Sequence, residues 1–143
     1  MANQKMGFEG QLLYGPAGST GQTLLENSRD ITLTYSQEKG DTTVRGDGTA
    51  PPTGTELVTK IMVGVEFQMV NDSTDTALEA LKVAATNGAP VALRGRDYAA
   101  GKGPDADFIL EGPSAPWPLN GEQVVTFTAS PTRSEGRNPQ KYV

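Results

Sequence analysis

Alternating hydrophobic and polar residues recur along this chain of 143 residues and predict a protein built mainly from β-strands. The clearest run covers residues 57–70, where Ile61, Val63, Val65, Phe67 and Met69 fall on one face. A helix would scatter these side chains around its circumference, so the period of two favours a strand. The run exceeds the usual strand length of ~5–6 residues, and such long strands often extend beyond their own domain.

Six further segments are predicted as strands, at residues 6–14, 29–37, 41–45, 89–97, 105–111 and 121–130. Residues 71–88 are predicted as a helix, because Ala77, Leu78, Leu81 and Ala84 recur at spacings of three and four. Gly88 and the proline that follows it two residues later end this pattern. The order of elements predicts a mainly antiparallel β-sandwich or barrel with one flanking α-helix.

Residues 38–56 form a long polar segment that is rich in glycine and proline. Segments of this length are uncommon in small domains and are usually functional or disordered. Charge divides the chain into an acidic β domain at residues 1–131, with 16 acids and 9 bases, and a basic C-terminal tail at residues 132–143. The tail carries Arg133, Arg137 and Lys141 against one acid, Glu135, and is expected to be a frayed terminus or an assembly surface.

Composition excludes several classes of function. The chain has no histidine and no cysteine, which removes Ser-His-Asp and Cys-His catalysis, thiolate-ligated zinc and disulfides. A net charge of −5 argues against a protein that wraps nucleic acid by neutralising phosphates. No apolar run approaches the ~20 residues of a membrane span, and the N-terminal residues lack the apolar stretch of a signal peptide. No enzyme, cofactor or resident metal is expected.

Two small constellations leave alternatives open. Asp105 and Asp107 share one side of a predicted strand, so they could hold a hard cation, although a solvated strand entrance is the preferred reading. Trp117 is the only tryptophan and is flanked by prolines. It is interpreted either as a turn residue that covers the edge of the core or as an exposed contact anchor.

An ordered series of short motifs, from about residue 29 to residue 132, resembles the tail tube (major tail) proteins of long-tailed bacteriophages. The strand at residues 29–33 resembles the family's RDVTL, residues 44–46 resemble the end of its TTRG turn, and residues 65–70 resemble VEFEMVW. The predicted helix also resembles the family's pattern. So do three further segments, at residues 87–93, 103–108 and 125–132. The chain departs from the family at Asn71, at Leu78 and in the proline-containing segment 111–120.

This resemblance implies a β-sandwich flanked by one helix and a structural role without turnover. Six copies would form a ring, and rings would stack into the hollow tube that conducts the genome into the host. The implied partners are further copies of the chain, a tape measure protein, tail terminator and baseplate proteins, and genomic DNA that passes without specific binding. The protein would be made in the host cytoplasm and reside in the virion tail, with no membrane anchor.

Particular residues are candidates for these roles. A conduit must not retain DNA, so its lining should be polar or acidic rather than basic. One predicted sheet face meets that requirement and supplies the lumen-lining candidates, which are Thr32, Thr34, Ser36, Glu66, Gln68, Thr126 and Thr128. The long polar segment and the tail supply the candidates for contacts between subunits or rings, which are Asp41, Arg45, Asp47, Pro51, Pro52, Arg133, Arg137 and Lys141.

Four other functions compete with the tube subunit. The same fold could form a single ring, as a tail terminator or baseplate component, or a type VI-like secretion tube. A monomeric sandwich could instead bind a sugar or a partner through Trp117. An enzyme that uses carboxylates alone ranks last, because no acid lies in an aromatic-rich stretch of the sequence.

Overall fold

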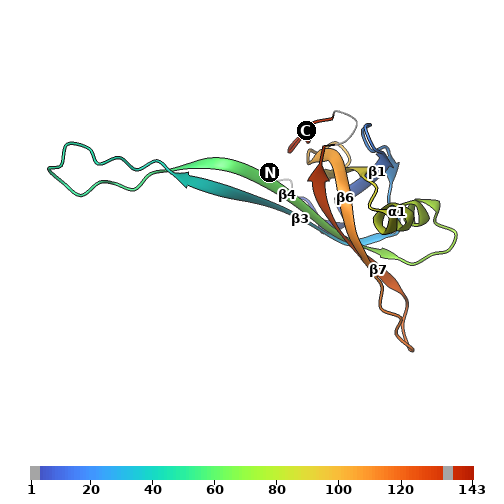
Figure 1. The fold of residues 1–143 in the computed structure, drawn as a ribbon. Coiled ribbons are helices and arrows are strands. Elements are labelled where there is room, and N and C mark those ends of the chain that lie inside the picture. Colours follow the sequence, from blue (N-terminus) through green and yellow to red (C-terminus); the bar gives the residue numbers. More distant parts are fainter. Residues whose placement is uncertain (1–3, 134–136) are drawn as a thin grey trace.

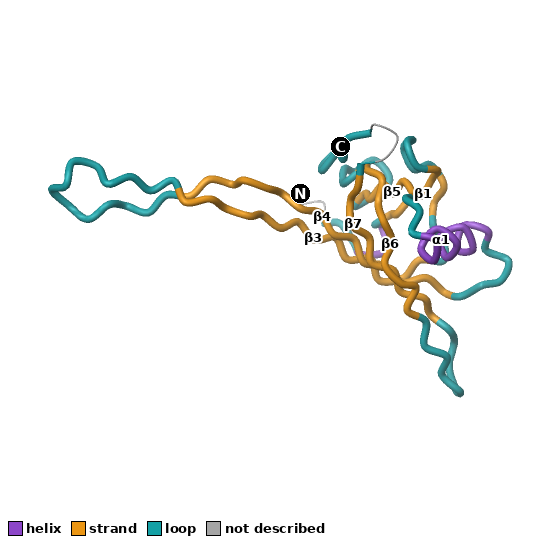
Figure 2. The backbone as a smooth tube through the Cα atoms, in the orientation of Figure 1, coloured by secondary structure: helices purple, strands orange, loops and turns teal. Residues whose placement is uncertain are grey.

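One antiparallel sheet forms the framework of the protein. The computed structural model describes residues 4–133 and 137–143 (Figures 1 and 2). Within these residues the sheet has seven strands in the spatial order β2-β1-β5-β6-β7-β4-β3, and neighbouring strands run antiparallel. The sheet curls into a half-barrel, with a single helix packed beside it (Figure 1). The predicted fold class, mainly β with one flanking helix, is confirmed.

The elements follow one another in the order η1 (Gly7–Glu9), β1 (Gln11–Pro16), β2 (Thr23–Leu24), β3 (Ser28–Asp41), β4 (Glu56–Val70), α1 (Thr76–Asn87), β5 (Val91–Arg96), β6 (Asp105–Ser114) and β7 (Val124–Thr132). The strand predicted at residues 6–14 begins later than expected, because residues 7–9 form a turn of 3-10 helix. The two-residue strand β2 was not predicted, since so short a pairing leaves no alternation in the sequence.

β3 and β4 form a long hairpin that projects far beyond the body (Figures 1 and 2). We call its outer part, residues 36–62, the arm. Strand pairing continues to Asp41 and Glu56, so only residues 42–55 of the predicted polar segment lie outside the strands. The strand predicted at residues 41–45 is wrong. The stretch that would pair with it contains Pro51 and Pro52, which have no amide hydrogen to donate to a ladder.

The hydrophobic core lies between the curled sheet and α1. Phe67 of β4 and Phe127 of β7 are fully buried, and their rings stack with centroids 5.4 Å apart. From the helix, Leu78 and Leu81 are fully buried against the same cluster. Each such side chain contributes about 1.5–3 kcal/mol through its removal from water. This packing fixes the helix on one side of the sheet and leaves the other side of β3, β4 and β7 uncovered.

Helix α1 is shorter than the predicted 71–88 because a separate turn precedes it. Asp72 accepts hydrogen bonds from the backbone and hydroxyl of Thr74, at 2.9 and 2.8 Å, which holds that turn. Asp75 is the N-cap, and its carboxylate accepts hydrogen bonds from the amides of Ala77 and Leu78. At the other end, Gly88 adopts φ +69°, a left-handed conformation that suits glycine. The helix is too short and too polar to cross a membrane, and it is the only α-helix in the described residues.

The C-terminal residues 137–143 are docked on the body, which corrects the expectation of a frayed tail. Gln140 exchanges two backbone hydrogen bonds with Asp105, at 2.9 and 3.0 Å. Val143 exchanges two with Gly103, at 3.1 and 2.9 Å. The hydroxyl of Tyr35 on β3 also donates a hydrogen bond to the carbonyl of Lys141. This segment therefore adds a short antiparallel connection beside the start of β6. Glu135 of the predicted tail lies outside the described residues.

Candidate assembly surfaces

A polar surface covers the side of the sheet that faces away from the core. Cross-strand pairing places Thr32 of β3, Glu66 of β4 and Thr128 of β7 in one row. Gln68 pairs with Thr126 in a second row, while Thr34 and Ser36 continue the surface along β3 opposite Gly64 and Met62. All seven predicted lumen-lining candidates thus lie on one face, and we call this surface the polar face.

The polar face gains a second acid from β6. Glu111 pairs with Thr128 and extends the row that begins at Thr32. The sequence analysis did not include Glu111 among the lumen-lining candidates, because its position on this face depends on the register between β6 and β7. The two rows of the polar face contain no lysine or arginine, whereas Glu66 and Glu111 are both exposed. Such a surface repels phosphate groups instead of holding them.

The loop at residues 42–55 is exposed throughout, but its own hydrogen bonds shape it. The amide of Thr42 donates to the carbonyl of Thr55 at 3.0 Å, which closes the loop at its base. Asp47 accepts hydrogen bonds from the amide and hydroxyl of Thr49, at 3.0 and 2.6 Å. Those bonds, the hydroxyl first, lower the pKa of Asp47. Asp41 has a lowered pKa for the same reason, through Thr43. These hydrogen bonds therefore favour the charged form of Asp47 in the loop and of Asp41 at its base.

Arg137 pairs with acids of its own chain. Its guanidinium contacts Asp105 and lies 3.0 Å from the Asp107 carboxylate, and the Arg137 side chain is only 15% exposed. The amide of Gly18 donates to both oxygens of Asp107 at 3.1 Å, and the hydroxyl of Thr20 donates to Asp105 at 3.2 Å. This corrects two expectations. The first is that the strand entrance is buried, not solvated. The second is that residue 137 is not part of a frayed tail, although its candidacy for contacts between subunits stays a prediction.

The remaining inter-subunit candidates are accessible. Asp41, Arg45, Asp47, Pro51 and Pro52 are exposed on the arm, and Arg133 and Lys141 are exposed near the C-terminus. Arg133 and Lys141 line a hollow at the base of the arm together with Lys60 and Ile61, whereas the five arm candidates lie farther out, at residues 41–52. No group of three or more histidines, cysteines and acids within the described residues is arranged to hold a metal ion.

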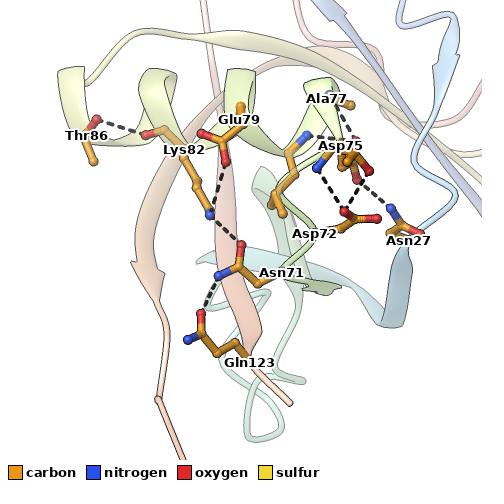
Figure 3. Close-up of polar contacts among 11 residues, drawn as sticks. Asn27, Asn71, Asp72, Asp75, Ala77, Glu79, Lys82, Thr86 and Gln123 are labelled. Atoms are coloured by element: carbon orange, nitrogen blue, oxygen red, sulfur yellow. Dashed lines mark hydrogen bonds and ion pairs between the residues drawn. The ribbon is translucent and has the colours of Figure 1, made fainter.

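A polar network joins α1 and its N-cap to residues that flank β3, β4 and β7 (Figure 3). Asn71 follows β4 and donates to the side-chain oxygen of Gln123 at 2.6 Å, while the Lys82 ammonium donates to Asn71 at 2.7 Å. Asn27, just before β3, donates to Asp75 at 2.9 Å. These bonds hold the helix over the sheet, and Asn71 is one of the residues at which the sequence departs from the tail tube pattern.

Trp117 lies on the hairpin between β6 and β7, which projects from the body at the end opposite the C-terminus (Figure 1). Its side chain is 78% exposed. The reading in which it covers the edge of the core is therefore wrong. An open hollow beside it is lined by Asn71, Lys82, Gln123 and three small apolar residues, and it contains no carboxylate.

The fold is shared with solved tail structures. The chain matches a protein of the tail of an empty gene transfer agent particle, refined with helical C6 symmetry, at a TM-score of 0.73 and 13% identity. That match covers 96% of this chain and 98% of the other. A protein of the native gene transfer agent virion matches at a TM-score of 0.67 and 15% identity, covering 92% and 96% of the two chains.

The SPP1 tail tube, a hybrid solid-state NMR and electron microscopy structure, matches at a TM-score of 0.61 and 10% identity. This match covers 89% of the chain and 75% of the tail tube protein. No protein-family model matches the sequence, and neither does any curated protein sequence. At these identities, the comparisons establish that the chain has the fold of tail tube proteins.

Proposed function

We propose that this chain is a structural subunit of a phage-type tail tube, in which hexameric rings stack around a channel that conducts the genome. The observation that carries the proposal is the fold shared with assembled tails over nearly the whole chain, with one of those tails refined in C6 symmetry. The protein would act as a virion component without turnover, and genomic DNA would pass through it without specific binding.

The polar face supports a place at the channel wall. It unites Thr32, Glu66 and Thr128 in one row and adds Glu111, with no cation in the row. DNA near such a wall meets like charge and hydroxyl groups, so it slides instead of adhering. The helix covers the opposite side of the sheet and would then face outward.

The free sheet edges support assembly. β3 is the last strand of the sheet, and its outer edge spans residues 28–41 without a partner strand in the described structure. Long open edges invite pairing with another chain, and ring closure removes them. In the arm, β4 also lacks a second neighbour before Val65, where its pairing with β7 begins.

The arm supports contact between rings. Its loop is exposed along its whole length, and Asp41 and Asp47 keep negative charge at its base and tip. We propose that Asp41, Arg45, Asp47, Pro51 and Pro52 contact an adjacent subunit, and that the exposed Arg133 and Lys141 belong to the same set of contacts. Tape measure, terminator and baseplate proteins would be further partners at the ends of the tube.

Electron microscopy of the purified chain in negative stain, at several protein and salt concentrations, tests the proposal. Hollow tubes with a regular ring repeat are the expected result. Isolated rings that never stack would favour a terminator or baseplate component of the same fold. A chain that stays monomeric even with its own baseplate present would contradict the tube subunit and favour a ligand-binding role around Trp117.

A further inference from the structure

The hairpin between β6 and β7 presents an apolar tip to solvent. Trp117 is 78% exposed and Leu119 is 97% exposed. No charged residue occurs between residues 112 and 121, although the chain as a whole is acidic. Prolines at 113, 116 and 118 restrict the backbone, so the tip loses little conformational entropy when it binds. A rigid, exposed tryptophan of this kind is typical of an interface anchor.

An apolar groove opens at the other end of the body. It has a volume of about 260 Å³ and lies between β1, β3 and the docked C-terminal segment. Its apolar lining comes from Leu12, Ile31, Leu33, Tyr35, Val65 and Tyr142, and Arg96, Asp97 and Lys102 also line it. Leu33, Tyr35 and Tyr142 remain exposed there. The groove therefore suits an uncharged, bulky side chain.

The tip cannot reach the groove of its own chain. The groove is lined by Gly95 and Pro104, next to Asp105 where β6 begins, whereas the hairpin starts at Ser114 where β6 ends. A strand of ten residues separates the two, a distance of about 30 Å at the usual rise per residue. Figure 1 shows the hairpin pointing away from the C-terminal end.

We propose that the Trp117 tip of one copy inserts into the Leu33–Tyr35 groove of a second copy in the next ring. The inference rests on the proposed tube assembly and adds a contact that is separate from the arm. Because donor and acceptor surfaces differ, the contact is head-to-tail, and between successive rings a head-to-tail contact propagates in an open series instead of closing within one ring. An open series of this kind is the arrangement that rings stacked along a tube require.

The chemistry of the tip favours a second copy of this chain as its partner. DNA is a poor partner, since the tip has no cation to neutralise phosphates. A second copy offers an apolar groove that accepts one large side chain, and Trp117 is the only tryptophan of the sequence. In addition, the hairpin falls in the segment where the sequence departs from the tail tube pattern, so it gives this chain a contact of its own.

Cross-linking tests the contact, because the chain has no cysteine and each introduced thiol is unique. The test variant carries Leu33→Cys and Leu119→Cys. The matched control carries Val83→Cys, an exposed aliphatic position on α1, together with Leu119→Cys. Each variant is assembled, imaged to establish that tubes form, treated with a short bismaleimide, and analysed on a denaturing gel.

The expected result is a ladder of covalent multimers for the Leu33/Leu119 variant and not for the Val83/Leu119 control. Tubes that form in both variants without a specific ladder would overturn the inference and leave the proposed function standing. If the unmodified chain fails to assemble under any condition, both the inference and the proposed function would be overturned.

A second readout uses the anchor itself. Trp117→Ser should raise the protein concentration needed for tube growth on the order of tenfold, as expected for the loss of a hot-spot aromatic. Trp117→Phe should recover most of that loss, and Val83→Ser should have no effect. If the Trp117→Ser variant forms tubes at the same protein concentration as the unmodified chain, this result would count against the contact.

Discussion

At the scale of single residues, Arg137 ties the C-terminal segment to the body through two ion pairs. It is the shared partner of Asp105 and Asp107, whose side chains are almost fully buried. Alternation in the sequence correctly placed these two acids on one side of a strand. It could not supply their partner, because Arg137 lies about thirty residues further on, beyond β7. Contacts of this kind depend on how the chain returns, which local pattern does not encode.

Arg137→Ser is therefore expected to destabilise the monomer itself. Removing the guanidinium breaks two buried ion pairs, a change that costs roughly 3 kcal/mol or more. Chemical denaturation monitored by circular dichroism measures the effect. Arg133→Ser, which removes an exposed arginine close by, should leave the free energy of unfolding nearly unchanged. Equal stability of the two variants would show that the Arg137 pairing contributes little.

Asp75 is the second residue with a clear energetic role. Its carboxylate accepts bonds from the amides of Ala77 and Leu78 and from the side chain of Asn27. Asp75→Ala should lower the free energy of unfolding by about 1–2 kcal/mol through loss of the N-cap. Asp30→Ala, at an exposed position on β3, is the control. Thermal denaturation of both variants gives the comparison, and an unchanged midpoint for Asp75→Ala would refute the capping role.

At the scale of elements, the chain is a body with two projecting hairpins. The long strand β4 and helix α1 were predictable, because their periods of two and of three to four are sustained over many residues. The residues at which the helix and the strands begin and end were less predictable. α1 begins at Thr76 because the Asp72 turn takes up the preceding residues, and β3 runs to Asp41 because β4 is there to pair with it. The two strands of the arm pair residues that are far apart in the sequence, so the local pattern could not show where this pairing ends.

The loop at the end of the arm should keep its shape in mild acid. Hydrogen bonds from Thr49 lower the pKa of Asp47 in the folded chain. A carboxylate with a lowered folded pKa contributes stability above its ordinary pKa, and this contribution is lost as the pH falls through the lowered value. An NMR titration of Asp47 and the Thr49 amide should show both signals shifting together, with a midpoint below the ordinary aspartate pKa. A midpoint above the ordinary aspartate value would contradict this account.

At the scale of the whole molecule, the sheet separates an apolar side, covered by α1, from the polar face. The sequence predicted which residues share the polar face but not whether the face lines a channel, because an ordinary solvated sheet shows the same alternation. The tertiary structure adds Glu111 to the surface and shows that Met62 interrupts it near the arm. The direction in which the face points in an assembly depends on contacts between copies, which a single chain does not contain.

The charge of the polar face should decide how tubes treat DNA. Glu66 is exposed, so Glu66→Lys should leave the fold intact and replace an acid with a cation in every copy. Unmodified tubes should not retain short duplex DNA at physiological salt, whereas Glu66→Lys tubes should retain it in a salt-dependent manner. Sedimentation of tubes with labelled DNA measures retention. Glu79→Lys, on α1, is the matched control for the outer surface, and equal retention by both variants would argue against a lining role for Glu66.

The central claim is that this chain builds a hollow tube with its polar face inward. Cryo-electron microscopy of the assembled chain, at a resolution that shows side chains, tests it most directly. The account predicts stacked rings around an open channel, with Thr32, Glu66 and Thr128 on the channel wall and α1 on the outside. A filament without a channel, or a channel lined by α1, would contradict it.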